Sequence, residues 1–178
     1  MKKYYVKGDF LKEKVERTVY DGMGKPLFKL WRDLAIKMGE MGAIVMTLQD
    51  EELYTIAEKK MTCLVYQGEH LIGECFGGPS QPNLQLFRRT YRVNKDGIDY
   101  QLKGNWFGFD FANEQTLIDI GRLKEIRILA KERVVGAIRF TEDHQYELEL
   151  ESGEDGAFWI AVLSWIDYQL SVGNNRRW

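Results

Sequence analysis

Apolar and polar residues alternate along most of the first 151 positions, where helical periodicity is scarce. The run Tyr-Glu-Leu-Glu-Leu-Glu at 146–151, for example, places apolar side chains on one face of an extended chain and carboxylates on the other. Elsewhere, β-rich runs flank short polar or glycine-bearing turns, of which the Asp-Gly pairs are the strongest hairpin signals. The five predicted hairpins have strands at 15–20 and 26–32, 44–48 and 53–59, 63–66 and 71–76, 86–93 and 98–106, and 126–130 and 134–140. Together with the run at 146–151, they predict a meander of about eleven or twelve strands.

The long apolar run at residues 156–172 is apolar on nearly every side. A surface helix has one apolar stripe opposite a charged face, so a helix without a charged face belongs in an interior or a membrane. Its charge-free part is too short for a bilayer, which needs about 20 apolar residues. We therefore predict a buried C-terminal helix that Ser152 caps and that ends near Gly173. The candidate core residues are Trp106, Phe158, Trp159, Leu163 and Trp165.

A sheet with one apolar face and a wholly apolar helix can both be buried if the sheet closes around the helix. Closure also removes exposed sheet edges. Gly136 shares the apolar face of its run with Ile138, which indicates close approach by a backbone or a bulky group. Two segments break the alternation: 34–42 is predicted to be a loop or short helical turn, and 76–83 a loop. The predicted fold is mainly β, a closed antiparallel barrel of about twelve strands around a hydrophobic helix, with residues 1–178 forming one domain.

Composition narrows the classes of function. The chain has 178 residues, 44% of them hydrophobic, and a net charge of −2, so nucleic acid is not expected as a partner and an anionic membrane would need a local basic patch. Charges interrupt the first ten residues, where a signal peptide would be apolar. The two cysteines are too few for a disulfide framework. We therefore expect a cytoplasmic protein without a transmembrane segment.

Residues that could carry catalysis or bind metal are few. The two histidines, His70 and His144, fall in predicted turns or loops and lack the spacing of a zinc or iron site. Cys63 and Cys75 would lie opposite or diagonal to each other, within disulfide reach, if their hairpin has a three-residue loop; small buried apolar side chains are the favoured interpretation. Asp167, the one acid in the apolar run, either carries proton chemistry or, as we favour, pairs at the barrel rim. We expect no enzyme activity, no metal and no cofactor.

Two groups of basic residues could contact an anionic surface. The first group is Arg88, Arg89 and Arg92, with Lys95 and Lys103 nearby across the hairpin. The second group is Arg122, Lys124, Arg127 and Arg133. Each basic residue near an anionic lipid surface contributes about 1 kcal/mol. The alternative is that both groups belong to solvated outer strand faces that nearby acids balance.

Several motifs in order resemble the tubby C-terminal-like superfamily, especially its LURP-one-related branch, to which phospholipid scramblases are also related. They are a hairpin with Tyr-Asp-x-x-Gly at 20–24, the segment Gly-Asn-Trp-Phe-Gly-Phe-Asp-Phe at 104–111, and an acidic turn before an apolar helix with Ile-Asp-Tyr at 166–168. The resemblance covers essentially the whole chain and implies a barrel of about twelve strands around the C-terminal helix. This sequence departs from the pattern at 114–124, where the family usually passes quickly to the next strand.

Tubby-type domains bind phosphoinositide head groups through basic residues on the barrel exterior, although no lysine or arginine of that lipid site can be matched here. From the resemblance we hypothesise a non-enzymatic binding or interaction module that docks to anionic lipid head groups through Arg88, Arg89 and Arg92, at the periphery of a membrane. One alternative is a carrier or enzyme with a lumenal pocket for a small apolar ligand, against which the helix argues because it would fill the lumen. The other is an adaptor that binds a protein partner.

Overall fold

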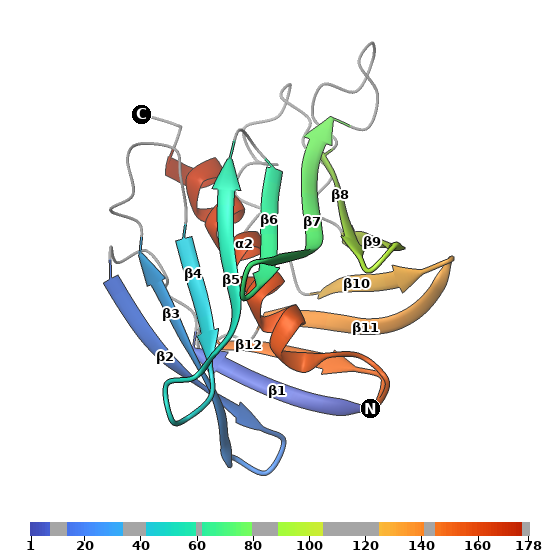
Figure 1. The fold of residues 1–178 in the computed structure, drawn as a ribbon. Helices are drawn as coiled ribbons and strands as arrows, with labels where there is room; N and C mark the ends of the chain where they lie inside the picture. Colours follow the sequence, from blue (N-terminus) through green and yellow to red (C-terminus); the bar gives the residue numbers. More distant parts are fainter. Residues whose placement is uncertain are drawn as a thin grey trace.

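The computed structural model describes residues 1–7, 14–33, 42–59, 62–79, 89–104, 125–140 and 145–175. Twelve strands form a closed antiparallel barrel, and helix α2 (Gly156–Asn175) runs through its interior (Figure 1). The predicted fold class is thereby confirmed. The strands are β1 (Lys2–Lys7), β2 (Lys14–Asp21), β3 (Pro26–Asp33), β4 (Gly42–Met46), β5 (Glu52–Lys59), β6 (Thr62–Gln67), β7 (His70–Pro79), β8 (Arg89–Lys95), β9 (Ile98–Gly104), β10 (Glu125–Ala130), β11 (Arg133–Phe140) and β12 (Gln145–Leu150).

Strand β1 closes the barrel, because it pairs with both β2 and β12. Its register with β12 runs from Lys2 opposite Leu150 to Lys7 opposite Gln145. This strand is absent from the runs predicted by alternation. Tyr4 and Val6 are its buried residues, and lysines occupy three of its six positions, so its own sequence carries little apolar signal. The partner strands, not its own pattern, place it in the barrel.

The tight turns gather at one end of the barrel, which we call the hairpin end (Figure 1). They join β2 to β3, β4 to β5, β6 to β7, β8 to β9 and β10 to β11, and helix α2 also begins there. In the β8–β9 turn, Asp96 and Gly97 both have positive φ, 50° and 78°, which matches the twist of a two-residue hairpin. The connections at the opposite end, including the predictions for 34–41, 114–124 and Trp106, fall outside the described residues.

The predicted loop at 76–83 begins too early. Strand β7 continues to Pro79, and Gly77, Gly78 and Pro79 pair with Tyr91, Thr90 and Arg89 of β8. Glycine and proline signal a loop when they are considered locally. Here the neighbouring strand pairs with their backbone, and proline is tolerated because it stands at the end of the strand.

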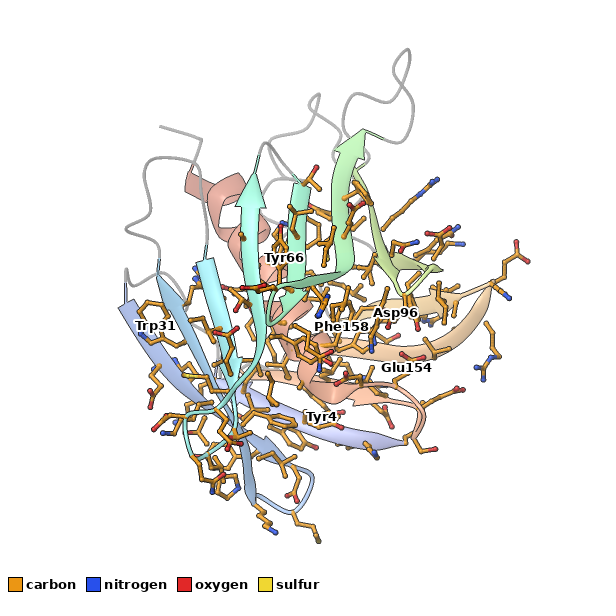
Figure 2. The ribbon with its side chains drawn as sticks, viewed as in Figure 1. Tyr4, Trp31, Tyr66, Asp96, Glu154 and Phe158 are labelled. Carbon is orange, nitrogen blue, oxygen red and sulfur yellow. The ribbon has the colours of Figure 1, made fainter. Side chains whose placement is uncertain are left out.

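Helix α2 fills the lumen with its side chains. Phe158, Trp159, Leu163 and Trp165 are fully buried, and Phe158 lies inside the barrel in Figure 2. Trp159 packs edge-on against Tyr100 of β9, with ring centroids 5.2 Å apart, and Trp165 packs in the same way against Tyr91 of β8 at 5.4 Å. Such pairs add directional contact to the burial of apolar area.

The helix contacts β3–β6 most extensively, and small residues line the wall on this side of the barrel. Ala43, Cys63 and Cys75 are buried there. A Cβ atom at Gly73 would lie 2.8 Å from Cε2 of Phe158, which is too close for any side chain to fit without a shift. Small wall residues therefore let the helix approach one side, while the two tryptophans reach tyrosines on other strands.

Asp155, not Ser152 as predicted, caps the helix. Oδ1 of Asp155 accepts a hydrogen bond from the Phe158 N–H at 3.2 Å, and its carbonyl accepts the first helical bond from the Trp159 N–H at 3.1 Å. The Tyr54 hydroxyl also donates to the Asp155 carboxylate. Ser152 lies in the preceding exposed turn. Tertiary contacts thus select the capping residue among several polar candidates in the acidic turn.

The acidic turn fixes the start of the helix to the barrel wall. Nζ of Lys95 lies 3.4 Å from the Asp155 carboxylate and 4.7 Å from the centroid of the Phe158 ring. Glu154 accepts hydrogen bonds from the Tyr100 hydroxyl at 3.3 Å and from Nε1 of Trp159 at 3.1 Å. Burial, and then the Glu154 carboxylate, raise the pKa of Tyr100 to about 12. Burial acts to raise the pKa of Asp155, but its hydrogen bonds and Lys95 outweigh burial and hold that pKa below the ordinary value.

We expect Gly136→Ala to destabilise the barrel, because a Cβ atom there would lie 2.7 Å from the Glu149 carbonyl oxygen and 2.7 Å from Cδ2 of Leu150. Overpacking of this kind costs about 1–3 kcal/mol. Urea unfolding should show this loss for Gly136→Ala but not for the control Gly153→Ala, because a Cβ atom at Gly153 would meet nothing within 4 Å. Equal stability of the two variants would contradict the close approach at Gly136.

The lowered pKa of Asp155 predicts a dependence of stability on pH. Because its folded pKa lies below the ordinary value of 3.8, its contribution is present above that value and is lost as the pH falls through the folded pKa. We expect Asp155→Asn to be less stable than the wild type at neutral pH and the difference to shrink toward about pH 3. Urea midpoints across this pH range measure the difference. Ser152→Ala should change little at any pH, and a larger loss for Ser152→Ala than for Asp155→Asn would restore Ser152 as the cap.

Candidate functional site

An exposed basic surface lies on the outside of β7, β8 and β9. Arg92 of β8 is exposed between the buried Tyr91 and Val93, and it lies directly opposite Phe76 of β7 and Gln101 of β9. The Phe76 side chain is 41% exposed, although it is aromatic. Lys103 is exposed on the same face of β9 as Gln101. We call this surface the outer basic face; it consists of Phe76, Arg92, Gln101 and Lys103.

Of the three arginines predicted for lipid contact, Arg92 is the one whose side chain is described. Arg89 is the first residue of β8, where its backbone pairs with Pro79, and Arg88 lies outside the described residues. Lys95, which the sequence placed near them, is instead directed to the start of α2 and Asp155. The structure therefore places Arg92 and Lys103 together on the outer basic face and separates Lys95 from them.

The outer surface of β10, β11 and β12 is neutralised by its own acids. Arg139 lies 3.0 Å from Glu125, 2.9 Å from Glu147 and 2.6 Å from Glu149. Hydrogen bonding to Arg127, 3.0 Å away, and to Arg139 lowers the pKa of Glu125. These charges balance one another, so this surface has little excess charge to offer a ligand.

The second predicted basic group belongs largely to this neutralised surface. Arg127 pairs with Glu125, and Arg133 pairs with Glu151 at 2.7 Å. Arg122 and Lys124 lie outside the described residues. For Arg127 and Arg133 the structure thus shows the acid-balanced outer face that was the alternative to lipid contact.

On the outer basic face the positive charges are not neutralised in this way. Within the described ranges, neither Arg92 nor Lys103 has a carboxylate partner. The carboxylate of Asp99, on the same strand as Lys103, accepts a hydrogen bond from Nδ2 of Asn94 at 2.7 Å. The two cations therefore remain available to an external anion, next to an exposed aromatic ring.

A second charged cluster lies inside the barrel. Nη1 of Arg32 is 2.9 Å from Oδ2 of Asp167, and the Tyr146 hydroxyl donates to Oδ1 of the same carboxylate. Arg32 is 1% exposed and Asp167 4%, so the expected position of Asp167 at the rim is wrong. The helix continues beyond it to Asn175, which keeps this position inside. Burial, and then the Asp167 carboxylate, raise the pKa of Tyr146.

The geometry of this cluster suits an anchor better than a proton carrier. Both carboxylate oxygens of Asp167 are engaged, one by a guanidinium and one by a phenol. A buried charge needs such partners, because desolvation is costly without them. The ion pair joins α2 to β3, and the phenol joins it to β12, so the cluster fixes the position of the helix along the barrel.

The remaining candidates for chemistry are dispersed. His70 is exposed at the β6–β7 turn, and His144 lies outside the described residues. Cys63 and Cys75 are buried, directly opposite each other on β6 and β7. In the part of the chain that the structure describes, no three His, Cys, Asp or Glu side chains gather as metal ligands. Among the same residues, no helix is long and apolar enough to cross a bilayer.

Sequence reasoning missed two features of these sites. Arg32 shares the inward face of β3 with Leu30, and this alternation could have identified a buried cation in need of an acid. Phe76 was assigned to a loop, so its position opposite Arg92 could not be derived. In both cases the missing information is the partner strand or helix, which lies far away in the sequence.

We expect Asp167→Asn to cost about 3–5 kcal/mol of stability, because it removes the carboxylate that pairs with buried Arg32. Arg32→Met should cost a similar amount for the converse reason. The double variant Arg32→Met/Asp167→Leu should be more stable than either single variant, since it buries no unpaired charge at this pair. Urea unfolding of all four proteins gives the coupling energy. Strictly additive losses would show that the pair does not act as a unit.

Comparison with known proteins identifies the family. The profile of the LURP-one-related family matches residues 2–167. A protein from Arabidopsis thaliana with a solved X-ray structure is similar in fold: the TM-score is 0.54 at 13% sequence identity, over 96% of this chain and 91% of that one. A search of curated proteins found no match. Because the family profile spans nearly all of the barrel and most of α2, the chain belongs to the LURP-one-related family.

Proposed function

We propose that this protein is a non-enzymatic binding module that docks to anionic phospholipid head groups through its outer basic face. The observation that carries the proposal is that Arg92 and Lys103 have no carboxylate partner in the described ranges, whereas Arg127, Arg133 and Arg139 on the neighbouring surface are paired. Basic residues at an anionic membrane contribute about 1 kcal/mol each.

The exposed aromatic ring supports a membrane surface as the ligand. Phe76 lies directly opposite Arg92, so one apolar ring and one guanidinium can reach a membrane together. Peripheral docking combines apolar contact with electrostatic attraction to anionic lipids. Arg88 and Arg89, at the start of β8 or just before it, are proposed to extend the positive surface. Such docking would place the protein at the periphery of a membrane.

The lumen is a poor candidate for a carrier or enzyme site. Every residue of α2 from Gly156 to Asp167 is buried, and its aromatic side chains pack against strands on more than one side. A small apolar ligand would have to displace Trp159 or Trp165 from these contacts. Family membership also supports a tubby-like domain without catalytic activity.

A second candidate function, an adaptor for a protein partner, is favoured by the hairpin end. Of the eight large hydrophobic side chains that are exposed among the described residues, seven lie there. They are Met1, Tyr20, Met23, Leu48, Leu71, Ile98 and Val134. The turns at this end are rich in acids, including Asp50, Glu51 and Asp96, so the surface would suit a partner with basic and apolar residues rather than an anionic membrane.

Vesicle co-sedimentation tests the lipid proposal. Phosphatidylcholine vesicles with and without phosphatidylserine are compared at low and moderate salt, where screening should weaken the binding. We expect binding to the anionic vesicles alone, weakened roughly 10- to 30-fold by Arg92→Ser/Lys103→Ser, because two charges are lost. The triple variant Arg88→Ser/Arg89→Ser/Arg92→Ser tests the contribution of the arginines that precede and begin β8.

The matched control is Arg127→Ser/Arg133→Ser, which removes two exposed cations that are already paired. It should retain most of the binding, although it changes net charge equally. Equal loss in both double variants would show a response to net charge rather than a site. No binding to either kind of vesicle would eliminate the lipid proposal and leave the hairpin end as the candidate contact surface.

A further inference from the structure

Cys63 and Cys75 are register partners across the β6–β7 hairpin. The hairpin has a two-residue turn, with Gln67 opposite His70, and a register shift between Val65 and Tyr66 brings the two cysteines directly opposite each other. Directly opposed residues in an antiparallel pair have Cα atoms about 4.5 or 5.5 Å apart. A disulfide accepts Cα separations of about 4.4 to 6.8 Å, so the backbone need not move to join them.

The two side chains also point to the same side of the sheet. Both are fully buried on the lumenal side of the barrel. Burial raises the pKa of the Cys63 thiol, and a hydrogen bond with the Cys75 thiol raises it further, so the two sulfur atoms are in contact. Contact between two thiols on facing strands is the arrangement from which a disulfide forms with small side-chain rotations.

We propose that Cys63 and Cys75 are a redox modification site, at which a small-molecule disulfide such as oxidised glutathione converts the dithiol into an intramolecular disulfide across β6 and β7. One cysteine thiolate attacks a sulfur of oxidised glutathione, and one glutathione thiolate leaves. The second cysteine thiolate then attacks the protein sulfur of the mixed disulfide, and the second glutathione leaves. The protein loses two electrons and two protons, and one oxidised glutathione becomes two reduced molecules.

Burial makes this reaction depend on opening of the hairpin. A thiol with a raised pKa reacts slowly, and a reagent the size of glutathione needs access to the first sulfur. The reaction therefore requires local separation of β6 from β7, which native proteins undergo without global unfolding. Once formed, the bond joins two strands of the wall near α2, and closing this short loop restricts the unfolded chain.

The test uses the full chain in glutathione buffers of graded redox potential, in a native arm without denaturant and in an opened arm with intermediate urea followed by dilution. After acid quenching, intact mass shows loss of two hydrogens or addition of glutathione, and non-reducing peptide mapping identifies the linked residues. We expect the native arm to reach the Cys63–Cys75 disulfide slowly and the opened arm to reach it quickly. The oxidised protein should have a Tm roughly 5–10 °C higher than the reduced protein.

Cys63→Ala and Cys75→Ala are the matched controls, because each leaves one thiol in the same hairpin. They should gain at most one glutathione and show no rise in Tm. The proposal is overturned if the native arm keeps its mass while the opened arm forms the disulfide, since the thiols would then be sealed core packing. It is also overturned if neither arm forms the bond or if oxidation lowers the Tm. The test is independent of the proposed lipid docking.

Discussion

The structure depends on enclosing a helix that has no polar face. Residues 156–167 of α2 are buried on all sides, and such a segment is stable in water only when protein surrounds it. A closed sheet provides this enclosure, because every strand presents one apolar face to the lumen and no edge remains open. Small residues such as Ala43 and Gly73 let the helix approach one wall, while Trp159 and Trp165 reach tyrosines on other strands.

Two polar clusters determine where the helix lies along the barrel. Apolar burial is non-directional and would tolerate some sliding of α2. Hydrogen bonds and ion pairs do not, because a shift would leave buried polar groups without partners. Asp155 and Glu154 bind the start of the helix to β5, β8 and β9, and Asp167 binds a point three turns later to β3 and β12. The helix is thus located by its acids, although its stability comes from its apolar residues.

A filled lumen directs attention to the outside of the barrel for function. There the charges are unevenly distributed. Arg139 and its three glutamates neutralise the surface of β10–β12, whereas Arg92 and Lys103 lie beside the exposed Phe76 without carboxylate partners in the described part of the chain. The hairpin end differs again, because it combines exposed apolar side chains with acidic turns. The same fold can therefore present an anion-binding face and a separate surface for a protein partner, provided that each is tested by itself.

The sequence alone determined the features that depend on neighbouring residues. Alternation located eleven of the twelve strands, Asp96-Gly97 marked a tight turn, and the run from Gly156 marked a buried helix, because strand period, turn conformation and helical burial are all local properties. The facing of Cys63 and Cys75 was within reach for the same reason, since one short turn separates their strands. Tertiary structure alone decided the rest. Strand β1, the continuation of β7 to Pro79, the choice of Asp155 as cap and the Arg32–Asp167 pair all depend on partners from distant parts of the chain, which meet only when the sheet closes around the helix.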